Sequence, residues 1–333
     1  LRQKRQYEAE SPQAVWNKIG FFRKDIRRGR QRHLVFATTQ QLRTLANSKR
    51  WYVDGTFKVV SKPFAQLFTI HAFVKRDHET KQVPLCFVLM SSRRKRDYKP
   101  VFRAVKNCLL EVAGDVKVEQ CMLDFEKATW TAMKDIFPEV QCHGCVFHWK
   151  QAVWRKAQEF GLQKAYRERG DVFNLITKLL ALPCLPWEVI PTLFGHLQRK
   201  GTGSGRLTEL FNYVENTWIT SAMWPPQVWT TYRQSIRSNN DVEGWHRALN
   251  AAAQKGSLPM YKLISLLAEQ SRLVTVQVRL VNEKRLCRYQ RRTYRKLQGR
   301  LFQLWDDFDA EKRTPKQLLH ACAHIYGILP VTK

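Results

Sequence analysis

The chain of 333 residues is long enough for one large domain or a few modest ones, and its 44% hydrophobic content indicates a folded protein. It carries 57 Lys and Arg against 28 Asp and Glu, a formal net charge of +29, which predicts a polyanionic partner. Nucleic acid is favoured because neutralising phosphates releases counterions, whereas no apolar run approaches the ~18 residues of a membrane-spanning helix.

The cysteines indicate a reducing compartment. The chain has 8 of them, and we expect no signal peptide because the first residues lack an apolar core. We therefore expect free thiols in the cytosol or nucleus.

Positive charge is concentrated near both ends. Residues 1–50 hold 13 Lys and Arg against three acids, and residues 270–300 hold 10 against one. Such a run is usually a solvated helix face, but two of them favour contacts with a nucleic-acid backbone. We predict basic helical segments at 1–48 and 257–333, for DNA binding or dimerisation. The candidate DNA contacts are Arg23, Lys24, Arg27, Arg28, Arg30, Arg32, Arg288, Arg291, Arg292, Arg295 and Lys296.

The middle of the chain alternates strands and helices. Three β-prone runs at 51–60, 64–75 and 82–91 predict an antiparallel meander. Strands at 116–124 and 139–147 each follow a helical pattern, so we expect parallel pairing. The fold class is therefore α/β, with a mixed five-stranded sheet and helices on both faces, similar to the ribonuclease H arrangement. Residues 49–150 and 236–256 would form this core, interrupted by an all-α insertion at 151–235.

Asp54 interrupts the first β-prone run. Asp-Gly between alternating apolar residues is a strong hairpin signal, so Asp54 and Gly55 can be interpreted as a turn. The alternative is a rigid strand that holds a carboxylate for a metal ion.

Two further acids are candidates for the same site. Asp124 ends the fourth strand just before a helix, where it is either a helix N-cap or a companion for Asp54. Glu243 lies near the start of the helix at 238–256, where the helix dipole also favours an ordinary glutamate. His246 falls on the same face of that helix and is expected to support the site. Competing acids are Asp241, Glu126, Asp97 and Asp77.

Three carboxylates of this kind suit two-metal chemistry at a phosphodiester. One hard cation, Mg²⁺ or Mn²⁺, activates the attacking oxygen and a second stabilises the leaving oxygen. The bridging carboxylate must be immobile, which favours Asp54 on a central strand. Asp124 would then hold one ion and Glu243 the other.

Three motifs resemble the transposase domain of Mutator-like elements, a group of DDE transposases with a ribonuclease H-like core. They are "VDGTFKVVSKPFAQLFTIHAFV", "MLDFEKATWTAMKDIFPEVQCHGCVFHWKQAVWRK" and "SNNDVEGWHRALN", within about residues 45–255. The resemblance implies that the triad is Asp54, Asp124 and Glu243. It also implies that Cys145 and His148, a C-x2-H pair, support the active site.

The same cysteine-rich stretch has a second interpretation. Cys142, Cys145 and His148 have spacings that could hold zinc, but structural zinc needs a fourth ligand, for which His143 and His246 are candidates. In the insertion, Trp224 or Trp229 could stack on an unpaired base, although large aromatics more often belong to a core.

The sequence thus predicts a DNA transposase that cleaves element ends and joins them to target DNA in the nucleus. Its partners would be terminal inverted repeats, target duplex DNA and a second copy of the chain, since two ends must be held together. No zinc-finger module is evident, so end recognition is expected from basic segments or from a part outside this sequence. The alternative is a domesticated transposase that binds DNA as a regulator without cutting it.

Overall fold

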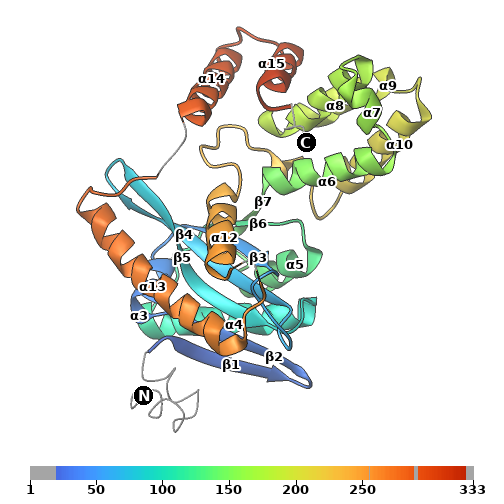
Figure 1. Cartoon of the computed structure of the whole chain (residues 1–333). Coiled ribbons are helices and arrows are strands. Elements are labelled where there is room, and N and C mark those ends of the chain that lie inside the picture. Colours follow the sequence, from blue (N-terminus) through green and yellow to red (C-terminus); the bar gives the residue numbers. More distant parts are fainter. Residues whose placement is uncertain (1–19, 255, 289–291, 328–333) are drawn as a thin grey trace. The chain divides into compact units, whose positions relative to one another are not determined.

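The computed structural model describes residues 20–254, 256–288 and 292–327 (Figure 1). The chain divides into two compact units. Of the described residues, the first contains those up to 142 together with those in 239–288, and the second contains those in 143–238 together with those from 292 to 327. Arg291 lies outside the described residues.

A mixed sheet forms the centre of the first unit. The strand order is β1-β2-β5-β4-β3-β6-β7. The neighbours β1 and β2, β2 and β5, β5 and β4, and β4 and β3 pair antiparallel, and β3 and β6 pair in parallel. The strands are β1 Phe22–Arg28, β2 Gln31–Phe36, β3 Arg50–Thr56, β4 Gln66–Arg76, β5 Glu79–Met90, β6 Gln120–Leu123 and β7 Gln141–Gly144. The meander predicted for the first three central strands is confirmed.

The sheet has seven strands, and the prediction of five was wrong. The two additional strands come from the N-terminal segment predicted to be helical. β1 is mostly charged, with apolar residues only at Phe22 and Ile26, and Gly29, with φ at +56°, turns the chain into β2. The density of Lys and Arg in this segment indicated a solvated helix face, but the two strands pair antiparallel at the edge of the sheet.

Helices cover both faces of the sheet, as predicted. In Figure 1, α12 and α13 lie on one face, and α3, α4 and α5 lie on the other. Their bounds are α3 Thr39–Ala46, α4 Lys95–Ala113, α5 Lys127–Ile136, α12 Asn240–Ala252 and α13 Met260–Asn282. On the first face, an apolar cluster joins Leu67 and Phe87 of the sheet to Leu249 and Leu267 of the helices. On the other, the Phe68 ring packs against Phe102.

The second unit is helical. It contains α6 Val146–Glu159, α7 Gln163–Arg167, α8 Asp171–Ala181, η1 Leu182–Cys184, α9 Ile190–Lys200, α10 Gly205–Val214, η2 Glu215–Ile219, α11 Pro226–Trp229, α14 Arg292–Asp309, α15 Pro315–Cys322 and η3 Ala323–Gly327. Between residues 151 and 235, where the sequence predicts an all-α insertion, the described elements are helices. The C-terminal segment is not one element, because α13 belongs to the first unit, whereas α14 and α15 pack with the insertion.

Specific contacts attach α14 to the insertion. The indole of Trp305 donates a hydrogen bond of 2.8 Å to the carbonyl of Cys184. Arg233 forms ion pairs with Asp306 and Asp309. Among the described helices, none combines the length and apolar character needed to cross a bilayer.

Candidate active site

Asp54 lies within β3 and not in a turn. Its backbone pairs with Thr69 of β4, and the strand continues through Gly55 to Thr56. A Cβ in place of the Gly55 hydrogen would meet Oε1 of Gln66 at 2.8 Å, so glycine lets this side chain approach the strand closely. The Asp-Gly pair thus reflects a close approach of side chain to backbone, and the hairpin interpretation was wrong.

Asp124 directly follows β6, the parallel neighbour of β3. The registered pairs end at Tyr52 and Met122, so Asp54 and Asp124 each lie two residues beyond the same pair. Asp124 is not a helix cap, because the N-cap of α5 is Glu126. Its own carbonyl accepts a 2.6 Å hydrogen bond from the indole of Trp130, which holds the chain as it leaves the strand.

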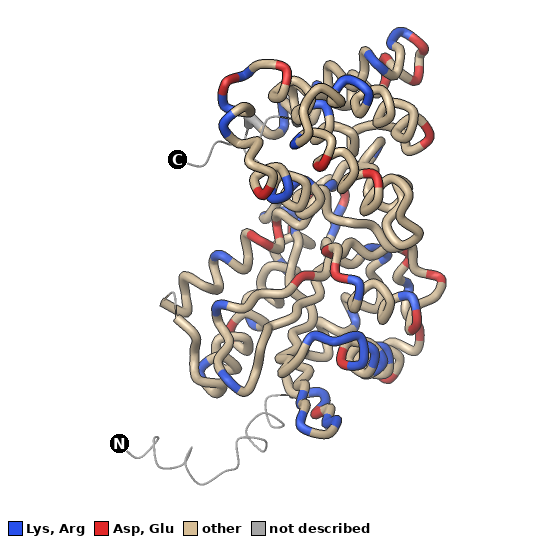
Figure 2. The backbone as a smooth tube through the Cα atoms, turned by 90° about the vertical axis from the view of Figure 1, so that its right-hand side faces the viewer, with Lys and Arg blue, Asp and Glu red and all other residues tan. Residues whose placement is uncertain are grey.

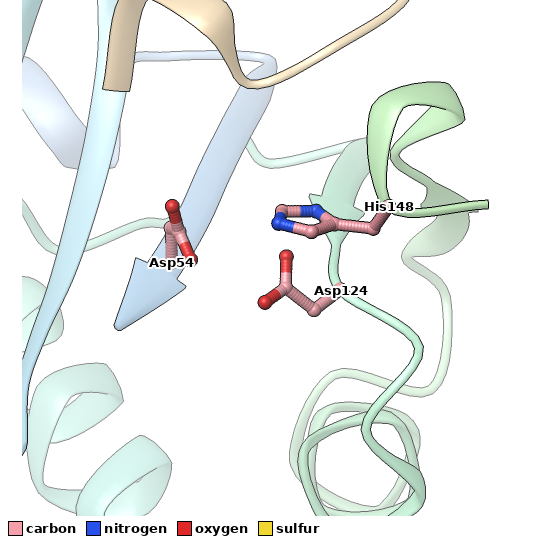
Figure 3. A group of neighbouring side chains, drawn as sticks. All are labelled: Asp54, Asp124 and His148. Carbon is pink, nitrogen blue, oxygen red and sulfur yellow. The ribbon is translucent and has the colours of Figure 1, made fainter. Parts of the chain in front are cut away.

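The two aspartates meet because the carboxyl ends of adjacent parallel strands lie at one edge of the sheet. Carboxylate oxygens of Asp54 and Asp124 lie within 4.8 Å of each other. Figure 3 shows both side chains, Asp54 on the strand and Asp124 on the chain that leaves the neighbouring strand. Two carboxylates this close repel one another, and a divalent cation between them removes that repulsion.

Comparison with known protein families agrees with this arrangement. The model of the MULE transposase domain matches residues 50–152, a range that contains both aspartates. This chain carries a MULE transposase domain. No curated protein matches the chain.

A hydrogen-bonded network lies behind Asp54 in the MULE transposase domain. Nδ1 of His246 in α12 lies 3.5 Å from Oδ2 of Asp54, and its Nε2 lies 3.2 Å from the hydroxyl of Thr69. The same hydroxyl lies 3.0 Å from Nε2 of His71 and donates to the carbonyl of Asp54. The tautomer of each imidazole decides which group donates in its contact with the Thr69 hydroxyl.

Burial determines the charge of His71. Burial first, and then the neighbouring His246, lowers the pKa of His71 well below its usual value, so His71 is neutral. The role predicted for His246 beside the site is consistent with its position. Sequence reasoning missed Thr69 and His71. Their only signal is that Thr69 pairs with Asp54 across the strands and that His71 faces the same side of β4 as Thr69. This signal can be used only when the pairing register is known.

Removing the Thr69 hydroxyl tests whether the network positions Asp54. In Thr69→Val, the two imidazole groups lose their shared hydrogen-bond partner at a buried position, and we expect a loss of about 1–3 kcal/mol in stability. We expect DNA cleavage to fall about 10-fold because His246 no longer has a fixed orientation. Thermal unfolding and single-turnover cleavage measure the two effects.

Two further variants make this test specific. Thr69→Ser keeps the hydroxyl and should retain most activity. Thr131→Val removes a hydroxyl that donates only to the carbonyl of Lys127 within α5, and it should leave cleavage unchanged. Equal activity of Thr69→Val and Thr69→Ser would contradict the positioning role.

Glu243 lies on the face of α12 that is directed at β3. The Asn239 side chain, at the helix N-cap, donates a 3.2 Å hydrogen bond to the carbonyl of Val53, and His246 contacts Asp54. Glu243 is four residues after Asn239 and three before His246, so all three lie on the same face of the helix. It is half-buried and does not belong to the group of ligand atoms within 4.8 Å that contains the two aspartates.

The competing acids are engaged elsewhere. Both oxygens of Asp241 bind Arg288, at 3.2 and 2.5 Å. Glu126 accepts hydrogen bonds from the hydroxyls of Tyr98 and Thr129. Asp97 is buried under the start of α4, where it accepts from the backbone of Arg94, and Asp77 pairs with Lys284.

The cysteines show no zinc site. The group of potential metal ligands formed within the described residues contains neither Cys142 nor Cys145. Burial raises the pKa of Cys142 to about 11, which disfavours the thiolate that zinc requires. His148 lies in the first turn of α6, three residues after the N-cap Cys145.

The predicted base-stacking tryptophans belong to the core of the helical unit. Trp229 is fully buried, and its ring stacks on Trp149 at 5.1 Å. Its indole donates to the carbonyls of Trp218 and Trp224. Trp224 in turn stacks on Trp218 at 5.7 Å. Large aromatic surface in an all-α unit is used for packing, so base stacking by Trp229 is excluded.

Several predicted DNA-binding cations have partners within the protein. Arg23 donates to the carbonyl of Ala37, and Arg32 pairs with Asp25. Arg288 pairs with Asp241 and lies over the ring of Phe73. The predicted contacts whose side chains are exposed are Lys24, Arg27, Arg28, Arg30, Arg295 and Lys296.

Proposed function

We propose that the chain is a DDE transposase that cleaves phosphodiesters at transposon ends and joins the exposed 3′-OH to target DNA. The observation that supports this most is the approach of Asp54 and Asp124, within 4.8 Å at the ends of adjacent parallel strands of a MULE transposase domain. These residues are separated by 70 positions in the sequence, and their side chains converge only because β3 and β6 are parallel and in register.

The donor set fits divalent metal. Asp54 and Asp124 supply hard carboxylate oxygens, which suit Mg²⁺ or Mn²⁺ and do not suit softer ions. When bound, two such ions activate the attacking oxygen and stabilise the leaving one. Asp54 would bridge both ions because its strand is central and its side chain is only 7% exposed. Asp124 would hold one ion.

The remaining roles follow from position along the chain. Glu243 would complete the triad as ligand of the second ion, because the face of α12 that carries it is fixed to β3 by Asn239 and His246. His148 would support the site beside Asp124, because it follows β7 by only four residues. His246 keeps Asp54 oriented and leaves its second carboxylate oxygen, Oδ1, to accept from the backbone of Gly55 at 2.7 Å.

The cellular setting is part of the same proposal. Duplex DNA in the nucleus is the partner that the net charge of +29 favours. Because transposition joins two ends, we also propose a homodimer or a larger assembly.

Metal dependence tests the function. We expect the chelator-treated protein to leave DNA that carries the ends of its own element intact, and Mg²⁺ or Mn²⁺ to restore cleavage with 3′-OH products. Ca²⁺ should support binding with little cleavage. Gel analysis of end-labelled duplex measures the products. Binding without cleavage in either metal would contradict the enzyme and favour the domesticated DNA-binding regulator.

A further inference from the structure

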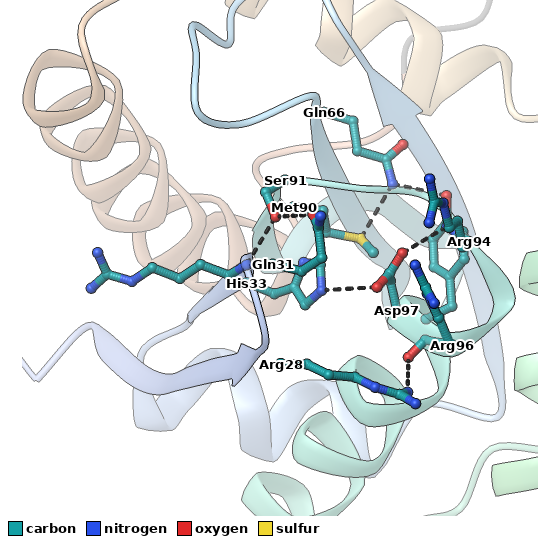
Figure 4. Close-up of polar contacts among 11 residues, drawn as sticks. Arg28, Gln31, His33, Gln66, Met90, Ser91, Arg94, Arg96 and Asp97 are labelled. Carbon is teal, nitrogen blue, oxygen red and sulfur yellow. Dashed lines mark hydrogen bonds and ion pairs between the residues drawn. The ribbon is translucent and has the colours of Figure 1, made fainter.

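A basic cavity of about 730 Å³ lies between β1 and the first turns of α4. Figure 4 shows Arg28 from β1 beside Arg94 and Arg96, which lie at the start of α4. The cavity belongs entirely to the first unit, and β1 forms the opposite end of the sheet order from β7. Its charged lining consists of Arg27, Arg28, Arg94, Lys95, Arg96, Lys99 and Arg103.

Pro100 is the reason that β1 and α4 are joined here. Proline has no backbone N–H, so Pro100 cannot bond the carbonyl of Arg96 one turn earlier in the helix. That carbonyl instead accepts a 2.9 Å hydrogen bond from the guanidinium of Arg28. The contact spans 68 residues of sequence and fixes the arginines of the two elements around one space.

The positive charge of the cavity is only partly neutralised. Asp25 pairs with Arg27, and Asp135 is shared by Lys95 and Lys99. Asp97 is buried and bonds the start of the helix. If all three acids are set against the seven lining cations, four positive charges remain. The N-terminal end of α4, a helix of 19 residues, adds the positive end of its dipole. Figure 2 colours Lys and Arg blue and Asp and Glu red along the backbone, and the excess of blue reflects 57 Lys and Arg against 28 Asp and Glu.

The cavity opens at the same end of the sheet as the two aspartates. Tyr98 of α4 donates to Glu126, two residues after Asp124, and accepts from Gln66, which packs against Gly55 beside Asp54. The guanidinium of Arg93 lies 4.7 Å from the centroid of the exposed Phe57 ring, just beyond β3. The four consecutive cationic residues 93–96 therefore lie between the end of β3 and the cavity.

We propose that this cavity, together with Arg93, binds the phosphates of duplex DNA beyond the scissile phosphodiester, an inference that rests on the proposed function. Forked guanidiniums match phosphate oxygens, and a row of them on two elements suits a polymer better than a single anion. Four strand spacings separate β1 from β3, which is about 19 Å. That distance corresponds to about half a turn of the duplex, or ~5–6 base pairs.

Binding with and without these charges tests the inference. The variant combines Arg94→Gln, Arg96→Gln and Arg103→Gln, which removes three exposed cations and retains the Arg28 contact. The matched control combines Arg43→Gln, Lys75→Gln and Arg76→Gln, three exposed cations of the same unit that do not line the cavity. Both are made in an Asp54→Asn background, so that the DNA stays intact.

The probe is a fluorescein-labelled 30-base-pair DNA duplex, followed by fluorescence anisotropy over a salt series. We expect the cavity variant to raise Kd about 10-fold or more and to reduce the slope of log K against log salt by about 2–3. The control should change both values much less. An unchanged salt slope in the cavity variant would overturn the inference, as would an equal loss of DNA affinity in the control variant. A loss of affinity that is larger for an RNA duplex of the same length than for DNA would also overturn it.

Cleavage assays separate this inference from the proposed function. With active protein, the cavity variant should cut duplexes that extend 12 base pairs past the scissile position more slowly than wild type, and duplexes that extend 2 base pairs at the wild-type rate. If wild-type protein cuts nothing but the cavity still governs DNA binding, the transposase proposal fails and the cavity assignment holds. Equal effects on both duplexes would contradict the cavity's place beyond the scissile bond.

Discussion

Replacing Asp54 by asparagine is expected to reduce metal-dependent DNA cleavage by at least about 10³-fold, or about 4 kcal/mol of transition-state stabilisation. Asparagine keeps the size of the side chain, and its Oδ1 can still accept from Gly55, so β3 should fold normally. What is lost is the charge, and a neutral amide cannot bridge two divalent cations.

Binding must be measured beside cleavage. Asp54→Asn removes a negative charge near the phosphate backbone, so we expect DNA affinity in the absence of metal to be unchanged or higher. Single-turnover cleavage and fluorescence anisotropy give the two quantities. The control is Asp115→Asn, which removes an exposed carboxylate of the same unit and should behave as wild type. Cleavage that survives in Asp54→Asn would remove Asp54 from the catalytic site.

We expect the second large effect for Glu243→Gln, which should reduce the rate of DNA cleavage by roughly 10²-fold or more. The comparison is with Asp241→Asn, an acid on the same helix turn that pairs with Arg288. If Glu243 holds the second ion, its variant should lose activity and require more metal, whereas Asp241→Asn should lose only a few-fold at most. Titrating cleavage rate against Mn²⁺ measures the shift in metal requirement.

The opposite ranking has a clear meaning. If Asp241→Asn is inactive and Glu243→Gln is active, the third ligand is Asp241, and its pairing with Arg288 describes a state that metal binding must break. If both variants retain activity, α12 supplies no ligand, and its contribution is the contact of His246 with Asp54.

Local sequence pattern was sufficient for the central part of the fold. Strands β3, β4 and β5 followed from β-prone runs, and α4 followed from its apolar face. The α12 prediction located Glu243 and His246 on one face correctly, because helical spacing is a local property. Parallel pairing of β3 with β6 also followed, since a helix separates them, and it brought Asp54 beside Asp124.

The same reasoning failed where two signals competed in one segment. In residues 22–36, the density of arginines indicated a basic helix and outweighed the turn at Gly29, so a hairpin was interpreted as a helix. At Asp54 and Gly55, the turn signal competed with the strand, and the close approach of Gln66 explains the glycine instead. Trp229 is an ordinary core aromatic, as its fully buried ring shows.

The sequence by itself determined the charge, the periodicity of the elements and the acids worth considering, because these depend on residue type and short spacing. Only the tertiary structure decided which of them meet. Thr69 contacts His246 across 177 positions of chain, and Arg28 reaches the carbonyl left by Pro100 across 68. Such contacts depend on strand order and register, which are set by packing of the whole unit and are not encoded in any short stretch.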